Sequence, residues 1–423
     1  MNSNTQKPSS KTSRSTGEAR SFRAPRSEEW ENIDSIKPLE KTENEALDRR
    51  GGDSVMHAQS KLEKMLLESL KMENVIVLAG SGCSYNVKGV NGYHGPSMGS
   101  HWDAVMKARP QEKVCEIAGK VAFDVNNGNI EGFLSHIETW LSLRSDNDVS
   151  SFLKEAKRII LHECSRFIDG ADLKSHKIFL HRLSRRRVRD RRLKLFTTNY
   201  DLCFERAASA LGCIPVDGFS FSYPRNYDPR FFEYDIVRRS RLDDGQGTYL
   251  EGVFHLHKLH GSVNWERRDD GVIVETQNPD PERACLIYPA SGKYQQSYAQ
   301  PYLESISQYM AAVRQPNTCV LVVGFGFNDD HLSQPLLSAV QSNPHIRLII
   351  VDPGARASSA NKDGNKFHKR LFDASLSGFD VWFVNCNFDR FSELIPDLRS
   401  LTPSERLFQA IQSVKGIGGY DGY

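Results

Sequence analysis

The sequence has 423 residues, of which 39% are hydrophobic and 26% charged, and its formal net charge is +2. This length suits two or three ordinary domains, or one large α/β domain with an insertion. The nearly balanced charge excludes a global field that attracts nucleic acid, and the longest apolar run, residues 319–327, is far too short to span a membrane. Because the N-terminus also lacks the apolar core of a secretory signal, we expect a cytoplasmic protein without membrane contact.

Residues 1–55 are expected to form a disordered arm and, from residue 28, a linker that can hold a short helix. The first 27 residues are rich in serine, threonine and basic side chains and show no hydrophobic period. They are compatible with a solvated leader and with a tail that contacts a partner or DNA. We expect the folded domain over residues 56–400 and a C-terminal helix and tail over residues 401–423.

The first predicted strand, residues 75–79, leads into Gly80-Ser-Gly-Cys-Ser84. Gly80 and Gly82 carry no Cβ, so the backbone can turn sharply and approach a ligand closely. A strand that ends in a glycine turn is how α/β sheets hold a nucleotide pyrophosphate. The G-x-G-x-x-G fingerprint is incomplete because position 85 is tyrosine. Both a phosphate cradle and a plain strand-to-loop turn are compatible with this stretch.

Residues 101–184 carry helical apolar stripes and are expected to form an insertion beside the sheet. The preceding loop, residues 87–100, holds four glycines and is of the kind that closes over a ligand. Seven arginines then fall within residues 182–192, directly before the next predicted strand, 193–197. Such a run forms either a solvated face or a contact with an anionic partner such as DNA.

Polar side chains follow two of the predicted strands. Thr197-Thr-Asn-Tyr-Asp201 comes at the end of strand 193–197, where open α/β sheets place ligand contacts, although Asn199 or Asp201 can equally cap the following helix. His260 stands at the end of strand 253–259, beside a glycine. A histidine there suits a general base, because its pKa lies near neutral, but a lone histidine is more often structural.

Metal-binding patterns are weak in this sequence. His255 and His257 share one face of strand 253–259, but no nearby carboxylate or thiol completes a metal site. The eight cysteines include no C-x-x-C pair and no cluster with zinc spacing. We therefore expect reduced cysteines in a cytosolic core and no bound metal.

The C-terminal half repeats the alternation of strands and helices. The apolar strand 319–323 is followed by Gly324-Phe-Gly-Phe-Asn-Asp-Asp-His331, and strand 347–351 ends at Asp352, an acid placed to hold ribose hydroxyls. Six or more short apolar strands alternate with helices, and at least four end in small or polar residues. This pattern predicts a Rossmann-like, doubly wound parallel sheet with one ligand crevice along its carboxyl edge.

Four motifs stand in a fixed order between residues 70 and 390. They are Gly80-Ser-Gly-Cys-Ser84, Thr197-Thr-Asn-Tyr-Asp201, Lys258-Leu-His-Gly-Ser262 and Gly324-Phe-Gly-Phe-Asn-Asp-Asp-His331. Together they resemble the sirtuin family, specifically its bacterial sirtuin-like branch found in anti-phage defence. Residues 199–219 and 288–294 look closest to the sirtuin-like proteins that assemble with a HerA-type hexameric ATPase.

The resemblance implies a site for NAD as the substrate. Asn199 and His260 match the family's catalytic positions, with Asn199 beside the nicotinamide ribose. The positions that match its NAD-binding motifs are Gly80, Ser81, Gly82, Ser84, Asp201, Gly324, Gly326, Phe327 and Asp352. The resemblance also implies a homo-oligomer, a HerA-type ATPase as partner, and DNA contact through that partner or through residues 182–192.

The sequence departs from the deacylase sirtuins in two places. It lacks the four-cysteine zinc module, and its second glycine motif reads Gly-Phe-Gly-Phe where deacylases have a Gly-Thr-Ser core. Both departures favour hydrolysis of NAD to ADP-ribose and nicotinamide, in a defence effector without zinc. NAD-dependent protein deacylation, non-catalytic sensing of NAD or ADP-ribose, and a nuclease remain as alternatives.

Overall fold

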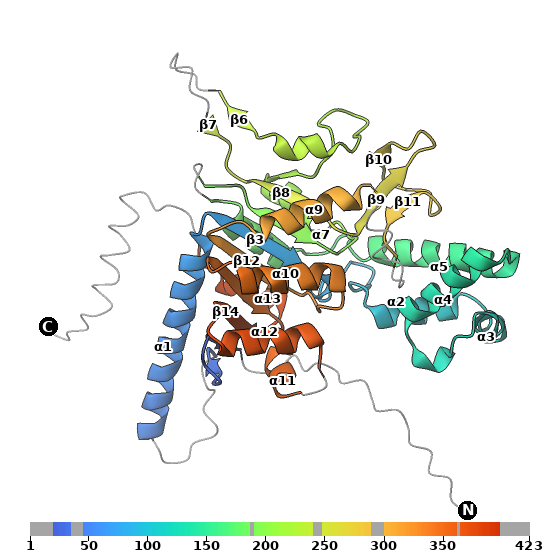
Figure 1. The fold of residues 1–423 in the computed structure, drawn as a ribbon. Helices are drawn as coiled ribbons and strands as arrows, with labels where there is room; N and C mark the ends of the chain where they lie inside the picture. The colour runs from blue at the N-terminus through green and yellow to red at the C-terminus, as the bar shows by residue number, and fades with distance from the viewer. Residues whose placement is uncertain are drawn as a thin grey trace, which may run out of the picture.

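The computed structural model describes residues 20–34, 45–186, 190–239, 248–288, 300–361 and 364–397. These residues build a nine-stranded, mostly parallel central sheet with helices on both faces (Figure 1). The predicted doubly wound α/β architecture is thereby confirmed. The start of the arm at residues 1–19 and the C-terminal helix and tail expected over residues 401–423 lie outside the described residues.

The parallel part of the sheet reverses its strand order between β3 and β12. The spatial order is β14–β13–β12–β3–β4–β8–β5, with β1 and β2 added beyond β14. After β3, the chain builds β4, β5 and β8 on one side and then β12, β13 and β14 on the other. Open α/β sheets bind ligands outside the carboxyl ends of their strands at such a reversal. The bounds are β3 Asn74–Ala79, β4 Lys194–Thr197, β5 Ile214–Val216, β8 Val253–Lys258, β12 Thr318–Val323, β13 Ile346–Val351 and β14 Val381–Asn385.

Successive side chains of the central strands pack into two separate cores. In β3, Val75 and Val77 belong to the core on one face, whereas Ile76 and Leu78 belong to the core on the other. The sequence of a strand that is buried on both faces is a continuous run of apolar residues. This is why the sequence predicted β3, β12 and β13 nearly to the residue.

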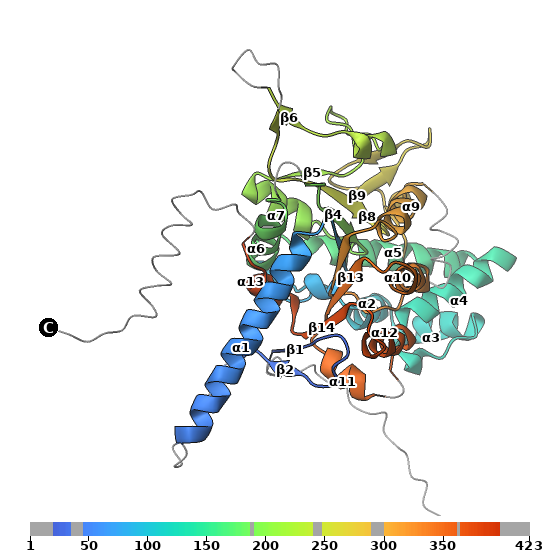
Figure 2. The same cartoon turned by 60° about the vertical axis from the view of Figure 1, so that its left-hand side comes forward.

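Helices cover both faces of the sheet, as Figure 2 shows. One face carries α1 Glu45–Leu70, α6 Lys174–Leu183, α7 Cys203–Leu211 and α13 Phe388–Leu394. The opposite face carries α9 Tyr302–Ala312, α10 Asp330–Ser342, α11 Ala355–Ala360 and α12 Lys366–Leu376. The two layers leave the carboxyl ends of the strands free for the site.

The prediction of a disordered arm and linker is wrong for residues 20–34 and 45–55. β1 Ser21–Arg23 and β2 Glu31–Asn32 form an antiparallel pair, and β1 also pairs with β14 at the edge of the sheet. Phe22 is fully buried, and its ring stacks on that of Trp382 at 6.2 Å. The helix α1 already begins at Glu45. One buried aromatic side chain in a polar stretch creates no hydrophobic period, so pattern analysis missed this strand.

The predicted helical insertion is present but ends earlier than expected. It consists of α2 Met98–Lys107, α3 Gln111–Lys120, η2 Val125–Asn127, α4 Ile130–Leu143 and α5 Asn147–Arg166. These helices share an apolar core of their own and project beside the sheet (Figure 1). The expected end at residue 184 is wrong because Phe179, Leu180 and Leu183 of α6 pack into the core of the sheet.

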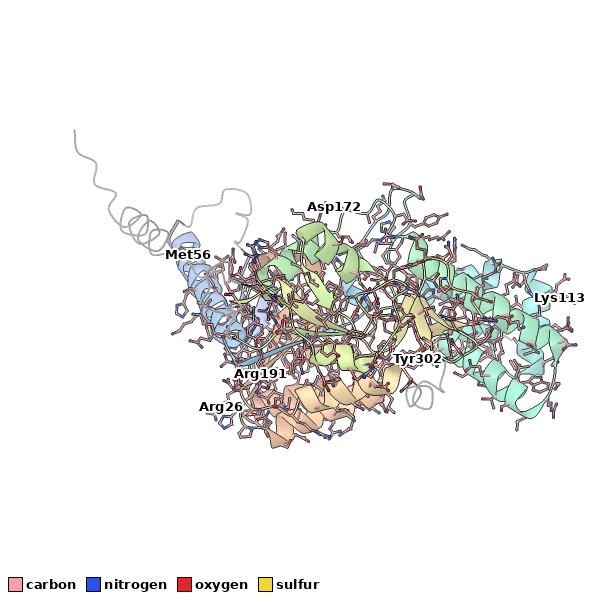
Figure 3. All side chains as sticks on the ribbon, turned by 90° about the horizontal axis from the view of Figure 1, so that it is seen from above. Arg26, Met56, Lys113, Asp172, Arg191 and Tyr302 are labelled. Carbon is pink, nitrogen blue, oxygen red and sulfur yellow. The ribbon has the colours of Figure 1, made fainter. Side chains whose placement is uncertain are left out.

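Two small antiparallel sheets complete the described structure. β9 Gly261–Arg267, β10 Ile273–Glu275 and β11 Ala284–Leu286 form one, and Val263 and Leu286 from it pack into the core of the insertion. The other sheet pairs β6 Val237–Arg238 with β7 Thr248–Tyr249, beyond the short helix η3 Pro229–Glu233. The molecule is elongated, with Met56 of α1 near one end and Lys113 of α3 near the other (Figure 3). Within the described residues, no helix is long and apolar enough to cross a membrane.

Candidate functional site

Strand register brings the predicted motifs to one edge of the sheet. Ala79, the last residue of β3, lies opposite Val323 of β12 on one side and Thr197 of β4 on the other. Thr197 in turn lies opposite Lys258 of β8. All four strands therefore end at the same level, and the loops that follow them share the carboxyl edge.

The two glycine motifs contact each other at the reversal of strand order. The Gly82 N–H donates a hydrogen bond of 2.9 Å to the carbonyl of Gly324. A Cβ on Gly80 would lie 2.6 Å from the same oxygen, and one on Gly82 would lie 2.7 Å from the Gly324 Cα, distances that real side chains do not reach. The approach of the two loops therefore requires glycine here. The loop leads into the three-residue helix η1 Ser81–Cys83 and not into a long helix.

Five predicted site residues line one small cavity beside this contact. They are Ser81, Ser84, Asn199, Asp201 and His260. The cavity has a volume of about 140 Å³, and the start of α2 with the preceding loop, residues 96–98, forms part of its wall. Sequence motifs up to 179 residues apart thus meet at a single point, as the prediction of one crevice requires.

A hydrogen-bond network fixes the polar wall of the cavity. The Ser84 hydroxyl donates to Asp201 Oδ2 over 2.7 Å and accepts from Asn199 Nδ2 over 3.1 Å. Asp201 Oδ1 accepts the N–H of Cys203, the first residue of α7, at 3.0 Å, although the N-cap itself is Leu202. All three site side chains are buried. Because the Asn199 amide nitrogen is held by Ser84, the orientation of its side chain is set before any substrate binds.

His260 lies in the turn between β8 and β9 and is 3% exposed. Its Nε2 lies 3.4 Å from Nε2 of His331, in the first turn of α10. A hydrogen bond between two imidazole nitrogens needs one donor and one acceptor, so this contact places a proton between the two rings. Asp329, just before α10, also lines the cavity.

The remaining predicted residues lie outside the cavity. Gly326 is exposed, whereas the Phe327 ring is buried in the core beside α12 and its backbone is left-handed, with φ 56°. Asp352 is half-buried at the end of β13, where its Oδ1 accepts the Gly354 N–H over 2.6 Å. Phe327 therefore serves the core, whereas Gly326 and Asp352 remain accessible along the edge.

Sequence analysis missed the wall that the helical insertion supplies. His101 of α2, Cys164 of α5 and Phe167 line the cavity opposite the Asn199 network. Cys164 Sγ lies 3.6 Å from His101 Nε2. Burial lowers the pKa of His101 to about 4 and raises that of the Cys164 thiol, so both groups are neutral near pH 7. No motif marks these positions; the only signal is a polar residue on an otherwise apolar helix face.

The histidine pair on β8 has a packing role. The His257 ring lies between Phe196 and Phe232, at centroid distances of 4.5 and 4.0 Å, and burial lowers its pKa well below the usual value. Among the described residues, no three histidine, cysteine or carboxylate side chains are grouped so that they could hold a metal ion.

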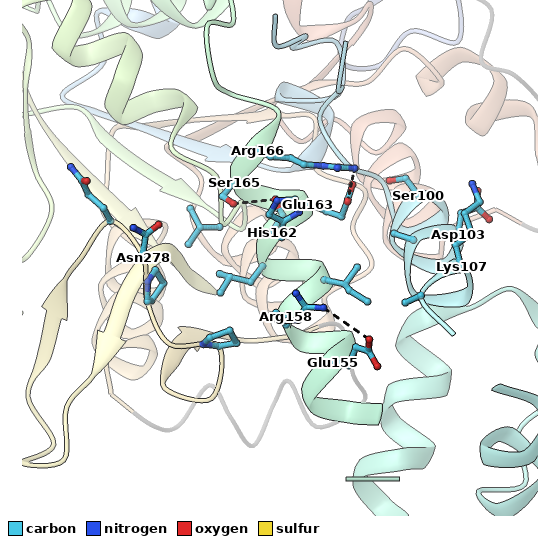
Figure 4. A pocket seen from close by; sticks show the side chains of 18 residues that line it. Ser100, Asp103, Lys107, Glu155, Arg158, His162, Glu163, Ser165, Arg166 and Asn278 are labelled. Carbon is cyan, nitrogen blue, oxygen red and sulfur yellow. Dashed lines mark hydrogen bonds and ion pairs between the residues drawn. The ribbon is translucent and has the colours of Figure 1, made fainter. Parts of the chain in front are cut away.

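A larger cleft lies on the other side of α5 (Figure 4). It has two overlapping parts of about 810 and 1120 Å³, between the insertion and the loop after β10. His162, Ser165 and Arg166 of α5 face this cleft, whereas Cys164 faces the small cavity. The last turn of α5 thus separates the two spaces. The cleft carries charges of both signs, and its Arg166 is paired with Glu163 at 2.5 Å.

Most described arginines of the 182–192 run bond within the chain. Arg186 is buried and donates to the carbonyls of Leu70, Met72 and Glu73 at the end of α1. Arg182 and Arg192 likewise donate to backbone carbonyls, and Arg191 pairs with Glu73. Of the described members, these four have structural partners, while Arg185 is exposed.

Comparisons with known proteins bear on this fold. Residues 193–376 match a family model described as a SIR2-like domain, which is under half of the chain and excludes the first glycine motif. None of the curated proteins compared with the chain matches it.

Similar solved structures include two Sir2 proteins. One comes from work on the structural basis for the mechanism and regulation of Sir2 enzymes, and the other is a point mutant of a Sir2 homologue in complex with ADP-ribose. Each is 12% identical to this chain, and the alignment spans 83% of this chain and 98% of the Sir2 chain. The TM-scores are 0.35 and 0.36. Both scores are too low to support an argument about the site.

Proposed function

We propose that this chain hydrolyses NAD⁺ to ADP-ribose and nicotinamide. The observation that carries the proposal is the convergence of Ser84, Asn199, Asp201 and His260 on one cavity where the strand order reverses. The match of residues 193–376 to a SIR2-like domain supports a function that uses or binds NAD. The more specific proposal, that NAD is hydrolysed, rests on the chemistry of these four side chains.

The shape of the edge fits a dinucleotide that places only one end in the cavity. A volume of about 140 Å³ is well below the roughly 300 Å³ at which sites for drug-sized ligands begin. The cavity therefore suits a single ring, such as nicotinamide. The rest of the dinucleotide would lie along the touching loops of Gly80 and Gly324, with Asp352 further along the same edge.

The proposed reaction needs little covalent chemistry from the protein. The bond between nicotinamide N1 and ribose C1′ breaks, nicotinamide leaves as a neutral ring, and water adds to C1′. Asn199 would orient the ribose and the water, and His260 would take the proton that the water loses. His331 is placed to pass that proton on, because its Nε2 lies 3.4 Å from that of His260. A positioned general base typically contributes about 10²–10⁴-fold to the rate.

We propose a biological setting from the sequence resemblance alone. Hydrolysis would serve anti-phage defence and would be restrained or released by assembly of a homo-oligomer with a HerA-type hexameric ATPase. Contact with DNA would then occur through that ATPase or through exposed arginines of the 182–192 run, of which Arg185 is one. Regulation is expected because unrestrained cleavage of NAD would harm the host.

The products distinguish the proposed reaction from its alternatives. Purified chain, alone and with the co-expressed ATPase, is incubated with NAD⁺, with and without an acetyl-lysine peptide, and the products are identified by mass spectrometry. Hydrolysis predicts ADP-ribose and nicotinamide without peptide. Products that form only with peptide would indicate deacylation, and NAD binding without turnover would indicate a sensing subunit.

A further inference from the structure

An ion pair between a buried cation and a half-buried carboxylate lies beside the Asn199–Asp201 loop. Lys258, the last residue of β8, is 2% exposed, and its Nζ lies 2.9 Å from Oε1 of Glu205 in the first turn of α7. Lys258 opens the motif that contains His260, and the proposed reaction gives it no role. The pair therefore joins the end of β8, two residues before His260, to the helix α7 that begins after Asp201.

The Lys258 ammonium also holds the loop through its backbone. Nζ donates to the carbonyl of Asp201, and it lies 3.3 Å from the carbonyl of Tyr200. The Tyr200 carbonyl accepts the Val263 N–H as well, at 3.0 Å. One cation thus fixes the two successive peptide planes that flank Asp201. Those planes set the direction of the Asp201 side chain, which reaches Asn199 through the Ser84 hydroxyl.

A charge in this place is costly for folding. Burial raises the pKa of the Glu205 carboxyl, which Lys258 opposes, and Glu205 Oε2 has no hydrogen-bond partner among the described residues. Well-packed apolar side chains often replace a buried ion pair without loss of stability. An ammonium, however, can bind two carbonyls and a carboxylate at once, which no apolar side chain can do.

We propose that Lys258 is a positioning residue for the reaction, with Glu205 as its counter-ion. It holds the turn at residues 200–201 so that Asn199 and Asp201 face the substrate in one fixed orientation. It does not line the cavity, and its polar neighbours among the described residues are the Glu205 carboxylate and the two carbonyls. This inference rests on the proposed function, but its effect on ligand binding can be measured without turnover.

The test compares Lys258→Met, Glu205→Gln and the charge-free double variant with the unchanged chain. Three quantities are measured: thermal unfolding, the dissociation constant for ADP-ribose by calorimetry, and kcat and KM for nicotinamide release. Arg347→Met is the matched control. It breaks another partly buried pair, Arg347–Asp380 at 2.8 Å, which lies at the start of β13 on the opposite edge of the sheet.

We expect the double variant to fold and its kcat to fall about 10- to 100-fold, because small displacements of positioning groups have effects of that size. Affinity for ADP-ribose should fall with it, while Arg347→Met lowers the melting temperature and leaves kcat and affinity unchanged. Glu205→Gln keeps the Lys258 contacts to both carbonyls and should lose less activity than Lys258→Met.

Two results would overturn the inference. A folded double variant with unchanged kcat and unchanged ADP-ribose affinity would show that the pair does not position the loop. Failure of all three variants to fold would make the pair a requirement for folding and not for the site. If the unchanged chain releases no nicotinamide but binds ADP-ribose, hydrolysis fails, and the affinities still decide the role of Lys258.

Discussion

Gly80 and Gly324 approach each other so closely that a Cβ on Gly80 would lie 2.6 Å from the Gly324 carbonyl oxygen. The two residues follow β3 and β12, the neighbouring strands between which the strand order reverses. Glycine at these positions is thus explained by contact between two loops of the chain, before any ligand is considered. The two touching loops form the surface along which the dinucleotide is proposed to lie.

Replacing Gly80 with alanine should separate these loops. Overpacking of this kind costs about 1–3 kcal/mol of unfolding free energy, and we expect NAD affinity to fall as the loops move apart. Gly119→Ala is the control, because a Cβ there has no atom within 4 Å and the residue lies in α3. Alanine is the better helix former by up to about 1 kcal/mol, so this variant should be as stable as the unchanged chain or more so. Equal urea denaturation midpoints for the two variants would contradict the clash.

Removing the Ser84 hydroxyl should impair the site more than the fold. Ser84 bridges Asn199 and Asp201, so Ser84→Ala releases both side chains from one partner. We expect a stability loss of about 1 kcal/mol, typical of one hydrogen bond, together with a clear fall in kcat for nicotinamide release. Ser375→Ala, which removes a buried hydroxyl bonded to the Val381 carbonyl at 2.9 Å, should cost similar stability without loss of kcat. A Ser84→Ala variant that retains full kcat would rule out this role for the network.

Stability should fall as the pH drops below about 6.5, in part because of His176. The ring is fully buried between Phe204 and Phe388, each at 4.9 Å, and burial lowers its pKa to about 4. The unfolded chain therefore takes up the proton first, so the stability that neutral His176 contributes is complete above pH 6.5 and declines toward pH 4. The slope for one such histidine is about 1.4 kcal/mol per pH unit.

The contribution of His176 to the pH dependence of the unfolding free energy can be isolated by substitution. His176→Leu removes the titrating group, so the loss of unfolding free energy between pH 7 and pH 5 should shrink by about 2 kcal/mol relative to the unchanged chain. His345→Leu, at an exposed position, should leave the pH dependence as it is. Urea denaturation at the two pH values measures both. An identical pH dependence in His176→Leu and the unchanged chain would show that the ring is not held neutral.

The arginine run should divide into structural and exposed members. Arg186→Met removes the donor to the buried carbonyl of Leu70 and to two part-buried carbonyls just after α1, and one unsatisfied buried group costs about 1–3 kcal/mol. Arg185→Met should change stability by no more than about 0.5 kcal/mol, since Arg185 is exposed. Thermal unfolding of the two variants makes the comparison. Equal melting temperatures would contradict the structural role of Arg186.

Much of the fold could be predicted because its central strands are buried on both faces. Their apolar runs and the small or polar residues after them revealed the parallel sheet and its carboxyl edge. The same reasoning located Asn199 and His260 at strand ends, and the structure brings both to one cavity. The N-terminal strand could not be found in this way, because Phe22 is its only apolar side chain, although Ser21 and Arg23 are buried as well.

The unpredicted parts of the site come from tertiary contacts that leave no local pattern. His101 and Cys164 reach the cavity from helices of the insertion, 63 residues apart, and their only signal in the sequence is a polar residue on an otherwise apolar helix face. The sequence also did not show why Gly80 and Gly324 are glycines, because the contact between their loops joins segments that are far apart in the chain. Lys258 belongs to the motif Lys258-Leu-His-Gly-Ser262, but only its hydrogen bonds to the loop carbonyls indicate its role.

The measurement that tests the central claim most directly is nicotinamide release from NAD⁺ by the unchanged chain, Asn199→Ala and His260→Ala. It is made with and without the HerA-type ATPase, and circular dichroism verifies that each variant is folded. We predict release by the unchanged chain under at least one condition, and a fall of about 10²–10⁴-fold in folded His260→Ala, the usual effect of losing a general base. Asn199→Ala should also lose activity. Undiminished release by folded His260→Ala, or no release by the unchanged chain under either condition, would contradict the account.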